Sequence, residues 1–158
     1  MWSMTSVEEL RERLYSQCGR SVACRRAADY YIALVKNPCY PPMDKVTYNM
    51  RRYYMEFVMK YGLPPKCDVK ALVAERLRGT ELESYANEVA ELAELIRERL
   101  RTTSRVAAAA ATIIVAERHC VKMARVSVAA LFGASLNAVM AQVRRAYKLY
   151  DSITLNKA

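Results

Sequence analysis

The stretch VSVAALFGASLNAVMAQVRRAY, residues 126–147, holds two helical patterns separated by a glycine, and it decides how the second half of the chain folds. Ala129 is a small residue where two helices are expected to cross. Gly133, four residues later, suits a turn with positive φ because glycine has no Cβ. Ser135 is a typical N-cap residue for the helix that follows. These features predict a helix-turn-helix, and a plain αα-hairpin is the alternative that fits the same spacing.

A basic, acid-free segment surrounds this motif. From Arg118 to Tyr150 the chain contains no aspartate or glutamate. Such a segment neutralises phosphates and gives a salt-dependent affinity that is largely independent of base sequence. Asn137 and Gln142 are the side chains there that can form bidentate contacts with adenine. We predict a DNA-binding site that positions the phosphate backbone more than it reads bases, made of Arg118, Lys122, Arg125, Ser135, Asn137, Gln142, Arg144, Arg145 and Lys148.

Upstream of this segment, the hydrophobic periodicity is helical. Ser104 is expected to cap a helix whose body, residues 106–116, is mostly alanine and apolar on every side. A helix of that kind is typical of a central, buried position. Before it, Thr80 and Glu83 form a capping-box pattern for a helix that reaches about Leu100.

The first half also reads as helical. A first helix is expected to end near Gly19, a second to span residues 20–36, and a third to span about 44–61. Prolines break the pattern between the second and the third helix. Residues 63–66, Leu-Pro-Pro-Lys, are typical of a linker. We therefore expect an all-α chain with a boundary between residues 66 and 67, and a frayed tail over residues 151–158.

The composition favours a globular protein with a polyanionic partner. The 158 residues are 53% hydrophobic and 26% charged, with a formal net charge of +9, and a charge of that size favours nucleic acid. A charged thermophile surface is the alternative explanation. No phosphate-binding or dinucleotide glycine pattern is present, and no catalytic set emerges, so neither an enzyme nor a cofactor is expected. With no signal peptide pattern and no membrane-length apolar run, a soluble, cytoplasmic protein is expected.

Five cysteines leave the redox state open. No two of them form a CxxC pair, so no metal site is expected. An odd count argues against a secreted disulfide framework. A bridge between Cys39 and Cys67, or between Cys18 and Cys24, is compatible with an intracellular protein of a hyperthermophile. The alternative is that all five are thiols acting as small hydrophobic side chains.

The second half resembles the core of archaeal transcription factor B, the relative of eukaryotic transcription factor IIB. Residues 104–116, SRVAAAAATIIVA, are similar to the Ala-rich buried helix of the family's second repeat. Residues 126–147 resemble its terminal helix-turn-helix, and residues 69–96 resemble its first two helices. The resemblance implies that residues 67–150 form a cyclin-like repeat of five helices.

The first half resembles the family more weakly. Residues 21–35 are similar to the buried helix of the first repeat, and residues 53–68, YYMEFVMKYGLPPKCD, to its last helix and the linker. A reduced cyclin-like repeat over residues 1–66 is implied. The family's N-terminal zinc ribbon is absent, so this chain is not expected to replace a basal initiation factor. The family's arginine in the early recognition helix is also missing, since residues 139–141 are Val-Met-Ala.

These observations predict a transcription-associated protein that binds duplex DNA, with the TATA-binding protein or RNA polymerase as candidate protein partners and no membrane. The alternative is a cyclin-box module that binds protein instead of DNA. Tyrosines and arginines are concentrated in the first half, and both are enriched at binding hot spots. A second basic face is expected there from Arg51, Arg52 and Lys60.

Overall fold

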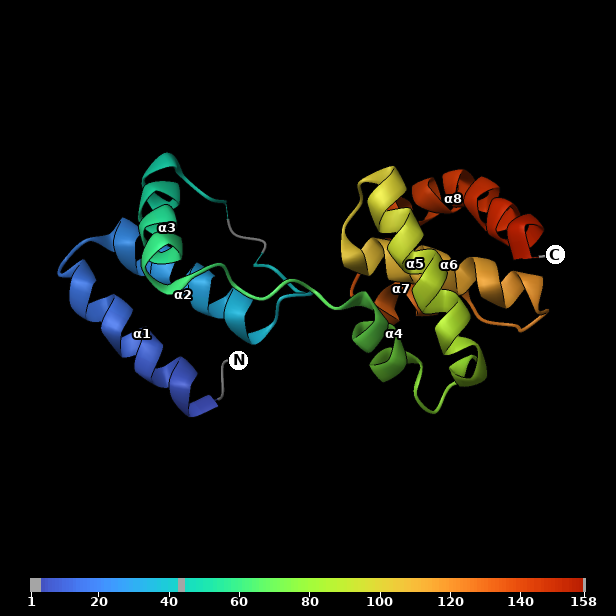
Figure 1. Ribbon diagram of the computed structural model, residues 1–158, viewed down its shortest axis with the longest axis horizontal. Helices are drawn as coiled ribbons and strands as arrows, with labels where there is room; N and C mark the ends of the chain where they lie inside the picture. Colours follow the sequence, from blue (N-terminus) through green and yellow to red (C-terminus); the bar gives the residue numbers. More distant parts are fainter. Residues whose placement is uncertain (1–3, 43–44, 158) are drawn as a thin grey trace. The chain divides into compact units, whose positions relative to one another are not determined.

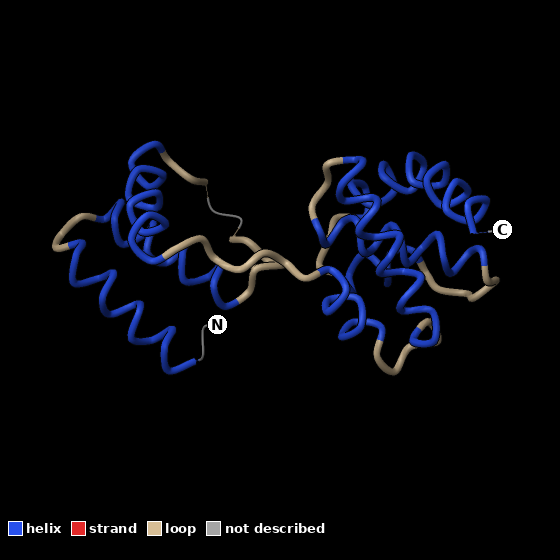
Figure 2. Tube along the Cα trace, in the orientation of Figure 1, coloured by secondary structure: helices blue, strands red, loops and turns tan. Residues whose placement is uncertain are grey.

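The computed structural model describes residues 4–42 and 45–157, and every regular element in those residues is a helix (Figures 1 and 2). The predicted all-α class is confirmed. The chain divides into two compact units, Met1–Cys67 and Asp68–Ala158. The division falls one residue after the expected boundary, at the end of the proline-bearing linker.

The first unit is built on α2 (Val22–Lys36), which packs against both α1 (Met4–Cys18) and α3 (Tyr48–Tyr61). Figure 1 shows α1 and α3 lying against α2. Tyr31 is fully buried in the core of this unit, and its hydroxyl donates a hydrogen bond to the Gly62 carbonyl at 2.6 Å. The α3 helix begins at Tyr48 and not near 44, because the Thr47 hydroxyl caps it by accepting from the Met50 amide. Residue 44 itself lies outside the described residues.

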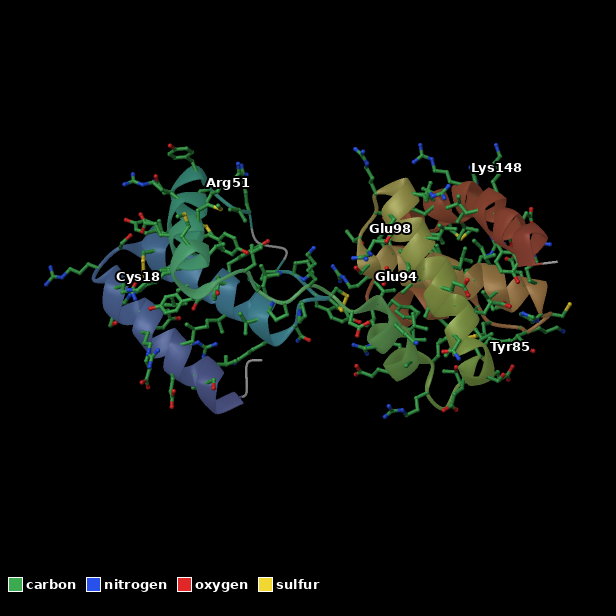
Figure 3. All side chains as sticks on the ribbon, in the orientation of Figure 1. Cys18, Arg51, Tyr85, Glu94, Glu98 and Lys148 are labelled. Atoms are coloured by element: carbon green, nitrogen blue, oxygen red, sulfur yellow. A yellow bond between two sulfur atoms is a disulfide. The ribbon has the colours of Figure 1, made fainter. Side chains whose placement is uncertain are left out.

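Two disulfides cross-link the first unit. Cys18–Cys24 joins the end of α1 to the start of α2, and Cys39–Cys67 joins the loop after α2 to the last residue of the unit. The structure therefore contains both bridges that the sequence left open. Figure 3 shows Cys18 at the turn between α1 and α2. The fifth cysteine, Cys120, is exposed and unbridged.

The other helices of the second unit pack around α6, as the alanine-rich composition of that helix predicts. Residues 107–116 are all buried, and α6 contacts helices on several sides (Figure 1). Its buried polar group, the Thr112 hydroxyl, donates to the Ala108 carbonyl at 2.7 Å, so it is not left unsatisfied. The elements of this unit are α4 (Val69–Leu77), the 3₁₀ turn η1 (Glu83–Tyr85), α5 (Ala86–Leu100), α6 (Ser104–Arg118), α7 (Arg125–Leu131) and α8 (Leu136–Lys157).

Three local predictions in this unit are wrong. Thr103, not Ser104, caps α6, since its hydroxyl accepts from the Val106 amide. The capping box at Thr80 does not start a long helix, because the 3₁₀ turn intervenes and α5 begins at Ala86. The tail is not frayed. It continues α8 to Lys157, and residues 151–157 contain no glycine or proline to end the helix.

Candidate nucleic-acid interface

The α7–α8 pair has the geometry of a helix-turn-helix. The axis of α7 and that of residues 136–151 of α8 differ by 106°, within the ~90–120° typical of the motif. The turn between the helices places Gly133 at φ 62°, so the predicted positive φ is confirmed. The Ser135 hydroxyl accepts from the Ala138 amide at 3.5 Å, as the predicted cap requires. Ala129, at the end of α7, is buried.

An arginine outside the motif braces its turn. The Arg105 side chain, at the start of α6, donates from Nη1 to the Gly133 carbonyl at 2.9 Å. The central helix therefore holds the turn in place through a charge-assisted hydrogen bond. The sequence carried no signal for this contact, because its partners are 28 residues apart and the acceptor is a backbone oxygen.

One face of α8 is exposed and carries positive charge. The exposed residues recur every three or four positions, which places them on one side of the helix. The opposite side, which includes Val139, Val143 and Ala146, is buried against the rest of the unit. Figure 3 labels Lys148 on this helix, with its side chain directed away from the unit. The exposed face consists of Asn137, Ala138, Ala141, Arg144, Arg145, Lys148 and, one turn further on, the acid Asp151.

Gln142 lies at the edge of this face and is half-buried. Its Oε1 atom is buried and has no hydrogen-bond partner among the described residues. An adenine contact would use both the oxygen and the nitrogen of the amide. In this conformation Gln142 does not present its oxygen to DNA, so Asn137 is the exposed amide on the helix that could read a base.

Two of the predicted phosphate contacts are engaged with acids. Arg118 pairs with Asp151, and its guanidinium lies 5.1 Å from the centre of the Tyr150 ring. Arg125 Nη2 lies 2.6 Å from Glu117 Oε1. Glu117 and Asp151 stand immediately before and after the acid-free segment, so the sequence pattern did not reveal these pairs. Exposed pairs of this kind contribute ~0–1 kcal/mol, which a phosphate can displace. Lys122 is exposed.

His119 belongs to a cluster that joins three helices. Its ring stacks on Tyr85 with a centroid distance of 4.1 Å, and Nε2 lies 2.8 Å from Glu88 Oε2. The same carboxylate oxygen accepts from the Tyr150 hydroxyl at 3.2 Å. Figure 3 labels Tyr85 at this end of the unit. The described residues contain no group of three potential metal ligands, and the contacts of His119 are those of a residue that ties α5, α6 and α8 together.

The three residues of the expected second basic face all lie on the exposed side of α3. Arg51, Arg52 and Lys60 are all exposed on α3. Lys60 lies nine positions after Arg51, about two and a half turns of an α-helix, so these two residues stand at opposite edges of the exposed side and Arg52 lies between them. Lys60 Nζ lies 5.6 Å from the centre of the Tyr61 ring.

Comparison of the chain with protein-family models, with curated proteins and with solved structures finds no match. Among the described residues, no single helix has the length and apolarity to cross a membrane, although the bent α7–α8 pair meets that test of length and composition when its helices are taken together.

Proposed function

We propose that the second unit binds duplex DNA through the α7–α8 helix-turn-helix, chiefly by contacts to phosphates. One observation carries this proposal. Two helices related by 106° meet at a positive-φ glycine, and over residues 136–150 the exposed face of the second helix bears three cations and no acid. Asp151, the exposed acid that follows on this face, is paired with Arg118. Such a pair presents its second helix to the major groove.

The arrangement of residues along α8 suits this role. Asn137, Ala138 and Ala141 occupy the exposed face of its first two turns, and two small side chains there let the helix approach the base edges closely. Lys148 lies 11 residues after Asn137, which is ~16 Å along a helix. That distance exceeds the ~12 Å width of the major groove. The cations of the later turns therefore reach the flanking phosphates while the first turns lie in the groove.

The resemblance of residues 69–147 to a repeat of transcription factor B supports a role in transcription. Because Asn137 is the exposed base-reading amide on the face, the second unit is expected to hold DNA with low sequence preference. A partner such as the TATA-binding protein would then supply the choice of promoter. The measurement is the affinity of the chain for a promoter duplex with and without that protein, and equal affinities contradict the partnership.

Duplex binding is tested by fluorescence anisotropy on the full chain over a range of salt concentrations. The three cations of α8 alone predict a slope of about −2.7 in log K against log salt, and each further contact from Arg118, Lys122 or Arg125 adds about −0.9. Arg144→Ala is expected to weaken binding roughly eightfold at ~0.1 M salt and to reduce the slope by about 0.9. Arg78→Ala, which removes an exposed arginine from the end of α4, is the matched control and leaves both unchanged. Affinity that is undetectable at ~50 mM salt, or indifferent to salt, refutes the proposal.

A further inference from the structure

The first unit has a groove that its own helices do not fill. It lies between α2 and α3 and encloses a volume of about 350 Å³. We call it the α2–α3 groove. Its apolar and aromatic lining comes from Ala27, Tyr30 and Leu34 of α2 and from Met50, Tyr54 and Met55 of α3.

The bottom of the groove is buried, and its edge carries an exposed, flexible side chain. Met50 is buried at 4% exposure, whereas Met55 is 50% exposed. The Tyr30 and Tyr54 rings meet edge to face across the groove with a centroid distance of 5.8 Å. Methionine side chains adjust to the shape of a partner because they are unbranched and flexible. Tyrosines add large, rigid contact areas.

Positive side chains outnumber negative ones in the lining of the groove and of the hollow beside it. Arg51 contributes to its lining, and Arg26 and Tyr30 line an adjoining hollow. Asp29 also borders that hollow, and its carboxylate accepts a hydrogen bond from the Tyr15 hydroxyl. The sequence of α3 has three basic residues and a single acid, Glu56. An acidic occupant is therefore favoured over a basic one.

We propose that the α2–α3 groove docks an acidic, amphipathic helix of a partner protein. Such a helix lays a row of apolar side chains, spaced three or four residues apart, into a groove between two helices. Its glutamates and aspartates then lie beside Arg51 and Arg26. A nucleic acid is disfavoured as the occupant, because a mostly apolar groove with two methionines offers little to a phosphate backbone. The groove belongs to the first unit, whereas the proposed DNA-binding face belongs to α8 of the second unit.

The test is a selection from a displayed library of random 18-residue peptides against the full chain. The expected winners combine acidic residues with apolar residues at helical spacing. A synthetic copy of a selected peptide then gives the dissociation constant by fluorescence anisotropy. Peptides that are neutral or basic, or a selection without enrichment, overturn the proposal.

Matched variants locate the peptide on the chain. Met55→Glu places a charge in the groove at a half-exposed position, and it is expected to weaken peptide binding at least tenfold. Val22→Glu makes the same change at a 66% exposed position outside the groove and is expected to leave binding unchanged. Arg51→Glu is expected to weaken binding and Lys60→Glu to preserve it. If the groove variant and its control weaken peptide binding equally, in either the Met55/Val22 pair or the Arg51/Lys60 pair, the proposal is overturned.

Two further results would identify a different occupant of the groove, and either one overturns the acidic-helix proposal. The first is displacement of the peptide by single-stranded DNA, with loss of DNA affinity in Met55→Glu. The second is a dimer of the free chain that Met55→Glu dissociates, seen by analytical ultracentrifugation. Duplex binding by the second unit is measured in parallel with Met55→Glu and is expected to remain, so failure of one proposal is distinguishable from failure of the other.

Discussion

Removal of the Cys39–Cys67 bridge is expected to destabilise the first unit strongly and leave the second unit intact. The bridged residues are separated by 28 positions, and the loop that they close contains all of α3. In the chain-entropy description, closing a loop of this length lowers the entropy of the unfolded chain by ~12 cal/mol/K, which is ~3.6 kcal/mol at 25 °C. The Cys18–Cys24 bridge, with a separation of 6, is worth ~2.4 kcal/mol by the same relation.

This loss is large relative to the stability of so small a unit. A domain of this length is stable by ~3–10 kcal/mol, and 1 kcal/mol shifts its Tm by ~4–8 °C. The double variant Cys39→Ser/Cys67→Ser is therefore expected to melt ~14–29 °C lower in the transition of the first unit. The transition of the second unit is expected not to move, because its cysteine, Cys120, is unbridged.

The assay is circular dichroism at a helix-sensitive wavelength during heating, with and without a reducing agent. Cys120→Ser is the matched control, since it exchanges a thiol at an exposed position and is expected to leave both transitions in place. Intact mass of the unreduced chain shows whether each bridge exists, because reduction adds two hydrogens per bridge. A shift below ~3 °C in the double variant, with the bridge present by mass, refutes the entropy argument.

Three other changes follow from the structure. Gly133→Val is expected to lower the free energy of unfolding by about 1–2 kcal/mol, measured with denaturant, because φ at this position is 62°. It is also expected to weaken duplex binding by shifting the turn. An unchanged free energy of unfolding contradicts the turn geometry. Ala109→Leu adds volume at a fully buried position of α6 and is expected to cost about 1–3 kcal/mol, whereas Ala74→Leu on the exposed side of α4 is expected to be neutral in the same urea titration. The pKa of Tyr15 is raised by its hydrogen bond to Asp29, and burial raises the pKa of Tyr31 and of Tyr54. A raised pKa in the folded state stabilises the fold below the unfolded value near 10, and that stability is lost as pH rises through the folded value. The first unit is therefore expected to unfold before the second at alkaline pH. Tyrosinate absorbance and circular dichroism measure the two transitions.

The features that the sequence predicted are those with a local or compositional cause. The buried position of α6 follows from five consecutive alanines with apolar neighbours, which leave that helix no polar face. The helix-turn-helix turn follows from Gly133, since few other residues adopt its φ. The all-α class follows from periodicity and from the scarcity of turn residues.

The features that the sequence did not predict depend on which of several possible partners a side chain contacts in the folded chain. Thr80 and Glu83 have the residue types of a capping box, but Glu83 Oε2 accepts from the Gly79 amide and the Thr80 hydroxyl accepts from the Leu82 amide. The partners expected for a box are thereby replaced, and a 3₁₀ turn forms. The pairing of Arg118 with Asp151 requires α6 and α8 to lie side by side, which no spacing in the sequence encodes.

The side chains on the exposed face of α8 suit contacts to phosphates better than contacts to bases. Each bidentate base contact supplies about 1–3 kcal/mol of discrimination, and Asn137 is the exposed side chain on this face that can make one with adenine. Each cation supplies a contribution to affinity that does not depend on sequence, through the release of counterions. If the proposed function holds, Arg144, Arg145 and Lys148 outweigh Asn137, and the second unit is expected to bind many sites with similar affinity. If the α2–α3 groove docks a partner that itself reads DNA, the first unit supplies the selectivity that α8 lacks. Loss of the groove would then leave affinity for random DNA unchanged while abolishing recruitment to the partner's site, and those two effects are separable in one footprinting experiment.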